Sequence, residues 1–261
     1  MTASQTPLAD RNVLVTGGSD GIGLASAVAF SRAGHRVAIV GRDAQKLATA
    51  VAQLSANCFA IVMDAGEPRS IEAGIDQLAA QSFRVDILVN NAGLIGNSEP
   101  VGRGLDQELR RSMEANFFGP ALLCSLLVPS MQSRGWGRVV NVASSAGLFA
   151  PPRQLPYSTS KAALIALTRG LAVELARDGV TVNAVAPGPV ATPRYLSEKG
   201  EAAVASRARA VPSGRLARPD EIAAAILFLA DERSSHITGH ILSLDGGEAA
   251  AGPYTAFSIQ R

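Results

Sequence analysis

The feature that most constrains the fold is an alternation between short β-branched runs and longer segments with helical spacing. The runs are almost continuously apolar, which is typical of strands that are covered on both faces. Strands joined through helices run parallel, so we expect a doubly wound α/β fold in which helices flank a seven-stranded parallel sheet. The expected strands are residues 12–16, 36–40, 58–63, 86–90, 138–142, 181–186 and 240–244.

Composition narrows the class of protein. A chain of 261 residues with 47% hydrophobic residues fits one larger domain over residues 1–261. The net charge of +2 without a basic stripe argues against a nucleic-acid partner. The longest apolar stretch, residues 222–230, is far shorter than the roughly 18 residues that span a bilayer, and the opening residues do not resemble a signal peptide. We therefore expect a cytoplasmic protein with no membrane partner.

The residues that bind metals are few and scattered. The two cysteines, Cys58 and Cys124, have no ligand spacing with the three histidines, His35, His236 and His240. No metal is therefore expected. The histidines also lie away from the expected carboxyl ends of the strands, which disfavours a hydrolase built on Ser144.

A glycine-rich turn follows the first expected strand. The segment T-G-G-S-D-G-I-G, residues 16–23, places Gly17, Gly21 and Gly23 where a tight turn and close backbone approach would cradle a phosphate at a helix N-terminus. It lacks the Gly-Lys-Ser/Thr ending of a nucleotide-triphosphate loop. A purely structural turn is the alternative, because a glycine trio alone is a weak signal.

Tyr157 and Lys161 stand one helical turn apart, so their side chains share a helix face. A tyrosine that exchanges protons at neutral pH needs a pKa about 3 units below 10, and a neighbouring ammonium can supply part of that change. The lysine is notable because the chain has 21 arginines and three lysines. The alternative is a partly buried tyrosine beside a solvated lysine.

Strand ends bring these signals together. Ser144 closes the fifth expected strand, and N-N-A-G, residues 90–93, closes the fourth. In a doubly wound sheet these ends share one edge with the glycine turn, so Ser144, Tyr157 and Lys161 are expected beside the phosphate cradle. The individual signals thereby predict one site.

In this set of motifs the chain resembles the classical short-chain dehydrogenases/reductases over about residues 10–247. The resemblance includes Asp64 after the third strand, Asn116, P-G at 187–188 with Thr192, and D-G-G at 245–247. It implies a Rossmann fold and an NAD(P)(H)-dependent oxidoreductase that moves a hydride between nicotinamide and a small-to-medium carbonyl or secondary alcohol. Tyr157 would be the acid/base, and Ser144 would bind the substrate oxygen. Lys161 would hold the nicotinamide ribose and lower the tyrosine pKa, and Asn116 would support a water next to Lys161.

The resemblance also implies a set of residues around the cofactor. These are Gly17, Ser19, Asp20, Gly21, Ile22, Gly23, Arg42, Asp64, Ala65, Asn90, Ala92, Gly93, Tyr157, Lys161, Pro187, Gly188, Val190 and Thr192. Each taken singly also has an ordinary structural reading, such as a turn or a helix cap.

The end of the second strand bears on the choice of cofactor. A protein that binds the 2′-phosphate of NADP needs a cation there, whereas one that binds the 2′-hydroxyl of NAD needs a carboxylate. Gly41 is followed by Arg42, which favours NADP(H) over NAD(H). Asp20 and Asp43 argue against this choice, and Arg42 could equally be a solvated surface residue.

The expected substrate pocket is mostly apolar. Its expected residues are Leu94, Ser144, Ala146, Leu148, Gln154, Tyr157 and Tyr195, with Phe149 and Pro189 nearby and residues 188–218 as a substrate loop that could close as a lid. Arg153 and Arg194 flank the expected entrance. The alternative activities are reduction of a 3-oxoacyl thioester of acyl carrier protein or coenzyme A, and non-catalytic nucleotide binding.

Two segments with wide apolar stripes, residues 106–133 and 158–177, bear on self-association. In the resembled family such helices pair across two-fold interfaces, so a homotetramer or homodimer is expected, unless both stripes are buried within one chain. The tail, residues 248–261, would either reach a neighbouring subunit or fray.

Overall fold

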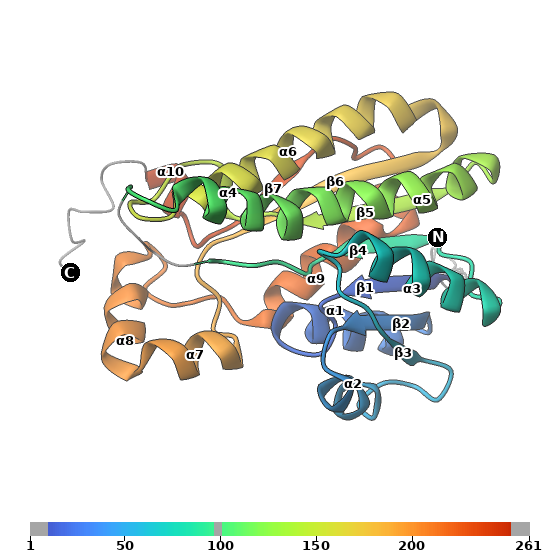
Figure 1. Cartoon of the computed structure of the whole chain (residues 1–261), viewed down its shortest axis with the longest axis horizontal. Coiled ribbons are helices and arrows are strands. Elements are labelled where there is room, and N and C mark those ends of the chain that lie inside the picture. The colour runs from blue at the N-terminus through green and yellow to red at the C-terminus, as the bar shows by residue number, and fades with distance from the viewer. Residues whose placement is uncertain (1–9, 97–100, 252–261) are drawn as a thin grey trace, which may run out of the picture.

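The computed structural model describes residues 10–96 and 101–251, in which helices cover both faces of a seven-stranded parallel sheet (Figure 1). The strands follow the order β3-β2-β1-β4-β5-β6-β7. This confirms the doubly wound fold expected from the alternation of runs. The strands are β1 (Asn12–Thr16), β2 (Arg36–Gly41), β3 (Phe59–Val62), β4 (Ile87–Asn90), β5 (Gly137–Val142), β6 (Val180–Pro187) and β7 (Ile241–Leu244).

The helices pack in two layers on the sheet. One layer holds α1, α2 and α9, and the other holds α3, α5 and α6, with α4 leading into α5. The helices are α1 (Gly21–Arg32), α2 (Ala44–Val51), α3 (Pro68–Ala80), α4 (Leu105–Met113), α5 (Gly119–Ser133), α6 (Leu155–Leu175), α7 (Pro193–Lys199), α8 (Glu201–Ala210), α9 (Pro219–Ala230) and α10 (Glu248–Ala251).

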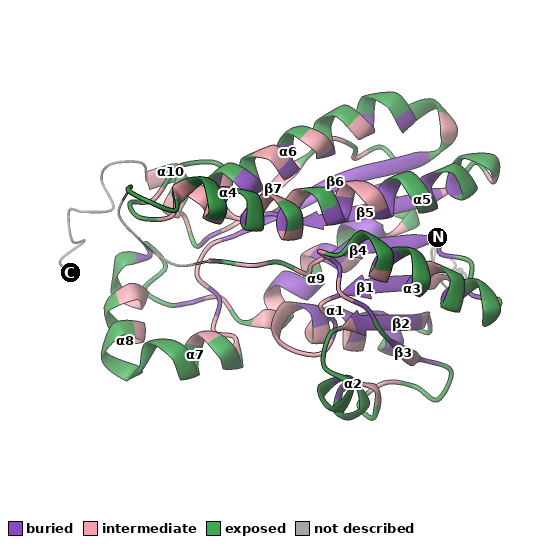
Figure 2. Cartoon of the chain, viewed as in Figure 1, coloured by how far each residue is buried: buried purple, intermediate pink, exposed green. Residues whose placement is uncertain are grey.

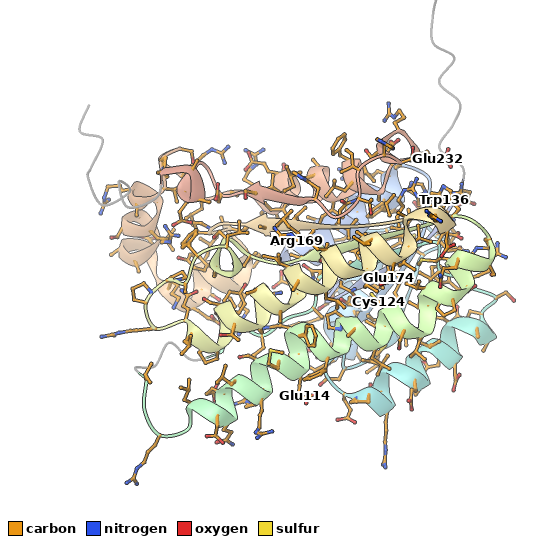
Figure 3. All side chains as sticks on the ribbon, turned by 90° about the horizontal axis from the view of Figure 1, so that it is seen from above. Glu114, Cys124, Trp136, Arg169, Glu174 and Glu232 are labelled. Atoms are coloured by element: carbon orange, nitrogen blue, oxygen red, sulfur yellow. The ribbon has the colours of Figure 1, made fainter. Side chains whose placement is uncertain are left out.

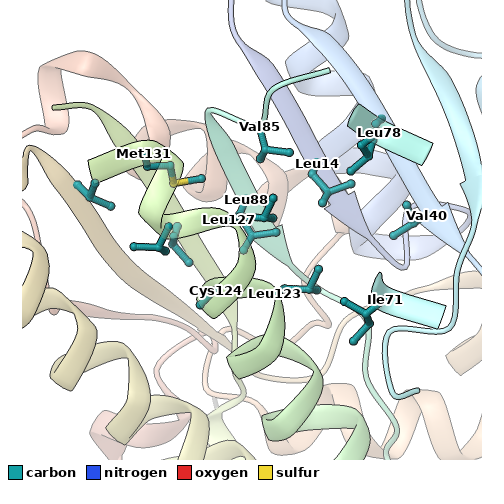
Figure 4. Packing of buried hydrophobic residues seen from close by; sticks show 14 of the residues in the cluster. Leu14, Val40, Ile71, Leu78, Val85, Leu88, Leu123, Cys124, Leu127 and Met131 are labelled. Carbon is teal, nitrogen blue, oxygen red and sulfur yellow. The ribbon is translucent and has the colours of Figure 1, made fainter. Parts of the chain in front are cut away.

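Both faces of the central strands are buried, as Figure 2 shows. Successive side chains of a strand point to opposite faces. Val13 of β1 therefore packs with Phe30 of α1, while Leu14 packs with Leu123 of α5. Figure 4 shows the cluster of buried side chains that includes Leu14 and Leu123, in which α5 lies against β1 and β4. Continuous apolar runs are the sequence signature of this double burial.

The strand order reverses direction between β1 and β4, because the chain builds outward from β1 to β3 and then returns to the other side of β1. In open α/β sheets, ligands bind outside the carboxyl ends of the strands at such a switch point. The glycine turn after β1 and the N-N-A-G segment after β4 lie at this point. The topology therefore indicates a ligand site at this edge of the sheet.

Two segments differ from the expectation. The helix expected over 106–133 is broken by a π-helical turn, Glu114–Phe118, which joins α4 to α5. Residues 188–218, expected as a loop, contain α7 and α8, which begin at Pro193 and Glu201. Proline at the first turn of α7 favours a helix start, although the Gly/Pro-rich lead-in suggested irregular chain.

Within residues 10–96 and 101–251, none of the helices has the length and apolar character needed to cross a bilayer. The same ranges contain no group of three or more His, Cys, Asp or Glu side chains arranged to hold a metal ion. The expectations for the opening residues and for the tail beyond Ala251 lie outside the described residues.

Candidate active site

Ser144 and Tyr157 come together from two consecutive elements at the end of β5. Ser144 follows β5 and starts a 3-10 turn, and its Oγ accepts a hydrogen bond from the backbone N–H of Ala146 at 3.1 Å. Tyr157 lies in the first turn of α6, close enough to Ser144 for that side chain to act on the pKa of its phenol. The pairing expected from the strand ends is therefore present in the structure.

Burial of Tyr157 raises the pKa of its phenol, and the hydrogen bond from Ser144 offsets part of this rise. The spacing of Tyr157 and Lys161 predicts the opposite direction, with Lys161 lowering the pKa of the phenol. The difference arises because Nζ of Lys161 donates to the carbonyl of Val142 at 2.8 Å and lies 5.9 Å from the centre of the tyrosine ring. Desolvation is the larger effect on the pKa of the phenol, so the phenol keeps its proton at neutral pH.

Lys161 is 4% exposed, and burial lowers the pKa of its ammonium to about 8. At pH 7 the side chain is still mainly charged. Its Nζ borders Gly93 of the loop after β4, because a β-carbon at Gly93 would lie 3.4 Å from that nitrogen. Lys161 therefore connects the end of β5 with the loop after β4.

Asn116 lies fully buried in the π-helical turn and binds the backbone of the loop after β4. Its Oδ1 accepts from the N–H of Leu94 at 2.7 Å, and its Nδ2 donates to the carbonyl of Leu94 at 2.8 Å. The same Nδ2 donates to Oγ of Ser160 at 2.9 Å. π-helical turns occur frequently at functional sites, and this one gives Asn116 its reach to Leu94.

The glycine turn has the shape that a pyrophosphate requires. Gly17 has a φ of +63°, which favours glycine, and a β-carbon on Gly23 would lie 2.1 Å from the carbonyl oxygen of Gly17. A β-carbon on Gly21 would lie 3.0 Å from Cγ2 of Thr192, so the loop after β6 meets the turn. A β-carbon at any of these glycines would press on the turn itself or on a neighbouring loop, so the tight turn depends on glycine and leaves the N-terminus of α1 open to a dinucleotide.

The amide of Asn91, which the sequence analysis did not select, braces this turn. Its Nδ2 donates to the carbonyls of Thr16 at 2.8 Å and Gly17 at 3.2 Å. The backbone N–H groups of Asn91 and Ala92 both donate to Oγ1 of Thr16 at 2.9 Å. Asparagine beside a strand end is the sequence signal that could have identified it.

Asn90, by contrast, directs its side chain into the interior. Its Nδ2 donates to Oδ1 of Asn141 at 2.9 Å and lies 3.7 Å from Sγ of Cys124. A contact from Asn90 to a ligand at the edge of the sheet would therefore come from its backbone. Pro187 and Val190 are likewise buried below that edge.

Arg42 extends from the end of β2 with its side chain 77% exposed. Its Nη1 lies 3.8 Å from Oδ2 of Asp64, which follows β3 and is itself 44% exposed. The two acids that argued against NADP(H) are both helix caps. Asp20 accepts from the N–H of Gly21, and Asp43 accepts from two N–H groups at the start of α2.

The expected substrate residues lie on three segments at the same edge of the sheet. Ala146 is buried, Leu94, Gln154 and Tyr195 are half-buried, and Leu148 is 41% exposed. Further exposed apolar side chains flank them on these segments: Ile95, Phe149, Leu155 and Leu196. Arg153, in the loop before α6, has a positive φ of 62°.

Comparison with known proteins agrees with this geometry. The family model described as Enoyl-(Acyl carrier protein) reductase matches residues 17–248. One relative, (2S)-((R)-hydroxy(phenyl)methyl)succinyl-CoA dehydrogenase subunit BbsD of Thauera aromatica, is 36% identical over 92% of this chain and 97% of its own length. The 3-oxoacyl-(acyl-carrier-protein) reductase of Thermotoga maritima is 34% identical over 90% of this chain and 96% of its own.

Solved structures give the same result. ElxO with NADP bound is 32% identical and superposes with a TM-score of 0.85, over 92% of this chain and 99% of that chain. These matches cover the glycine turn, the tetrad of Asn116, Ser144, Tyr157 and Lys161, and the segment after β6. The chain therefore belongs to the classical short-chain dehydrogenase/reductase family and is an NAD(P)-dependent oxidoreductase acting on carbonyl or hydroxyl groups.

Proposed function

We propose that the protein is an NADP(H)-dependent reductase of a small-to-medium carbonyl compound, with Tyr157 as the proton donor. The observation that carries this proposal is the half-buried, protonated phenol of Tyr157 beside Ser144 at the carboxyl end of β5. A nicotinamide bound there would supply the hydride. In the reverse direction, Tyr157 would take the proton of a secondary alcohol.

Ser144 is suited to hold the substrate oxygen. Its Oγ accepts from the N–H of Ala146, and its hydroxyl proton, which acts on the phenol of Tyr157 in this structure, would turn to the substrate oxygen. Two donors, Ser144 and Tyr157, would then face the oxygen on which negative charge develops. As the carbonyl carbon gains the hydride, the phenol of Tyr157 would give its proton to that oxygen, and the products are an alcohol and a phenolate.

Lys161 would serve two purposes. At pH 7 it is still mainly charged, with a pKa of about 8, so its ammonium would stabilise the phenolate left on Tyr157. Its remaining donors would bind the hydroxyls of the ribose next to the nicotinamide. Because it also binds the carbonyl of Val142, the ammonium is held in place before a cofactor arrives.

The cofactor choice rests on Arg42. Asp20 and Asp43 each accept hydrogen bonds at a helix N-terminus, so capping accounts for both acids without a ribose 2′-hydroxyl. The exposed guanidinium of Arg42 is free to meet a 2′-phosphate, and it would have to turn from Asp64 to do so. Asp64 would then line the adenine side of the site together with Ala65.

The other cofactor positions follow the edge of the sheet. The backbone around Ser19 and Ile22, at the N-terminus of α1, would receive the pyrophosphate. Ala92 and Gly93 would border the ribose, and Gly188 and Thr192 would border the nicotinamide amide.

The substrate would lie against the apolar side chains of the three segments around Leu94, Leu148 and Tyr195, with residues 188–218 closing over it. Apolar lining with few polar groups favours a hydrophobic carbonyl compound. A second candidate is a 3-oxoacyl thioester, because two of the relatives carry a coenzyme A or acyl-carrier-protein thioester in their names. A thioester would place its long carrier arm past the exposed residues Ile95 and Leu196.

We further propose that the enzyme works as a homo-oligomer, a tetramer or a dimer. α5 and α6 lie side by side in both Figure 1 and Figure 3. These helices and the π-helical turn before α5 carry exposed apolar side chains. Phe118 is 50%, Leu126 39% and Val173 80% exposed, and a groove of about 560 Å³ runs between α3 and the start of α5. A second copy packed on these helices would cover them.

The test is to follow the absorbance of reduced nicotinamide with NADPH and NADH against a panel of ketones, aldehydes and 3-oxoacyl thioesters. We expect turnover with NADPH on one of these classes. Tyr157→Phe should lower kcat by about 10²- to 10⁴-fold, as expected for loss of an acid catalyst, while the affinity for NADPH stays within about twofold. NADPH binding without turnover on any carbonyl, or a Tyr157→Phe variant with near-normal kcat, would refute the proposal.

A further inference from the structure

Ser160 lies between two residues of the site without facing the expected substrate or cofactor. It is fully buried in α6, one residue before Lys161 and three after Tyr157. Its Oγ donates to the backbone carbonyl of Tyr157 at 2.7 Å and accepts from Nδ2 of Asn116 at 2.9 Å. One hydroxyl group thus connects the first turn of α6 with the π-helical turn.

The hydrogen bonds that link Asn116, Ser160 and Tyr157 all run in one direction, from the amide through the hydroxyl to the carbonyl. Because the Ser160 hydroxyl donates its only proton to the carbonyl of Tyr157, it can only accept a hydrogen bond from Asn116. The amide of Asn116 must then present Nδ2 to Ser160, which leaves Oδ1 facing the N–H of Leu94. Ser160 therefore favours the same orientation of the Asn116 amide as the N–H and carbonyl groups of Leu94 do.

The orientation of that amide affects the site directly. A β-carbon at Gly93 would lie 2.9 Å from Oδ1 of Asn116 and 3.4 Å from Nζ of Lys161, so the two polar atoms border the same small space. With the amide reversed, an N–H group would face both the N–H of Leu94 and the ammonium of Lys161. Such an arrangement is unfavourable inside a buried site.

We propose that Ser160 is a positioning residue that locks the Asn116 amide and thereby holds Leu94 in register with Tyr157 and Lys161. The proposal deepens the proposed function and rests on it for the catalytic consequence. Ser160 itself touches neither the substrate oxygen nor the phenol. It acts through Asn116 and through the backbone of Tyr157.

The chain contains a closely matched control on the same helix. Thr168, two turns further along α6, is also fully buried, donates to the carbonyl of Leu164 at 2.8 Å and accepts from Nδ2 of Asn141 at 2.9 Å. It repeats the arrangement of Ser160 with a different asparagine, away from the tetrad. Removing either hydroxyl leaves one buried asparagine amide short of an acceptor.

The experiment compares Ser160→Ala with Thr168→Val in the full-length protein, using thermal stability, steady-state kinetics and NADPH binding. Both variants should lose thermal stability to a similar degree. We expect kcat to fall about 10- to 100-fold in Ser160→Ala, as for a misplaced reacting group, with little change in NADPH affinity. In Thr168→Val, kcat should stay within about threefold of the wild type. Equal losses of kcat in the two variants, or an unchanged kcat in Ser160→Ala, would overturn the proposal.

A second measurement does not depend on activity. The N–H of Leu94 is held by Oδ1 of Asn116, so its hydrogen exchange should speed up at least tenfold in Ser160→Ala and stay unchanged in Thr168→Val. If the wild-type protein turned over no carbonyl compound, the proposed function would be refuted. The hydrogen-exchange measurement would still show whether Ser160 holds the Asn116 amide in place. Unchanged exchange at Leu94 in Ser160→Ala would overturn the lock. As a second variant, Ser160→Cys keeps a weak donor and acceptor and should give intermediate exchange and kcat.

Discussion

Lys161→Met should change how the stability of the cofactor-free protein depends on pH. Burial lowers the pKa of Lys161 from its ordinary 10.5 to about 8. One pKa unit corresponds to about 1.4 kcal/mol, so keeping the ammonium charged costs the folded protein about 3 kcal/mol at pH 7. Methionine at this position removes the charge and with it this cost.

The direction follows from proton binding. Between pH 8 and 10.5 the unfolded chain holds the proton on Lys161 while the folded protein releases it, so the stability of the wild type rises with pH in this window. The cost is fully present below pH 8 and disappears above 10.5. Relative to Lys161→Met, the wild type should therefore gain about 2 to 3 kcal/mol of unfolding free energy between pH 7 and pH 10. The lost hydrogen bond to Val142 shifts the variant by a constant of about 1 kcal/mol and leaves the slope unaffected.

Urea unfolding followed by tryptophan fluorescence can measure this difference. Trp136 is the only tryptophan in the sequence, and the guanidinium groups of Arg11 and Arg138 lie 3.9 and 4.5 Å from its ring centre, so unfolding should change its emission. The control is Lys46→Met, which removes an exposed lysine and should give a curve parallel to the wild type. Subunit concentration must be kept constant. Parallel pH curves for the wild type and Lys161→Met would refute the argument that burial penalises this ammonium.

The remaining predictions concern the cofactor. Arg42→Ala should raise the KM for NADPH by about tenfold or more with little effect on NADH, as for a lost charged contact, and Arg32→Ala, an exposed arginine at the end of α1, should change neither. Equal effects on both cofactors would remove the basis for the NADP(H) preference. Gly23→Ala should abolish measurable NADPH binding in titration calorimetry, since its β-carbon would meet the carbonyl of Gly17 at 2.1 Å. Gly170→Ala, where a β-carbon meets nothing within 4 Å, should bind normally, and normal binding by Gly23→Ala would contradict the tight turn.

Much of the fold could be predicted from the sequence, because double burial leaves continuous apolar runs that mark each strand. The positions of Ser144 after a strand end and of Tyr157 and Lys161 on one helix face were likewise readable from spacing, whereas Asn116 was expected only from the family resemblance. The π-helical turn was not readable from the sequence, since no residue type among Glu114–Phe118 marks the change to i→i+5 hydrogen bonds. The hydrogen-bond partners of Asn116 could not be predicted either, because Leu94 and Ser160 are 22 and 44 residues away from it in the chain.

The electrostatics of the site were the least accessible to sequence reasoning. Spacing placed a cation one turn from Tyr157, and the natural conclusion was a lowered tyrosine pKa. Depth of burial and the direction in which Nζ points decide the sign, and both come from tertiary packing. Asp20 and Asp43 illustrate the same difficulty. From the sequence both carboxylates argue against 2′-phosphate binding, whereas in the structure both accept hydrogen bonds from backbone N–H groups as helix caps.

The raised pKa of Tyr157 also predicts how the two directions of the reaction respond to pH. Reduction needs a protonated phenol, which burial favours, so kcat for reduction should be flat near neutral pH. Oxidation of an alcohol needs the phenolate, so its kcat should climb with pH through and beyond neutrality, by up to tenfold per unit until Tyr157 titrates. The positive charge of an oxidised nicotinamide and of Lys161 would move that midpoint downward, without changing the sign of the slope. Stopped-flow measurement of the hydride step in both directions between pH 6 and 10 tests this, and an oxidation rate that falls as pH rises would mean that another group removes the proton.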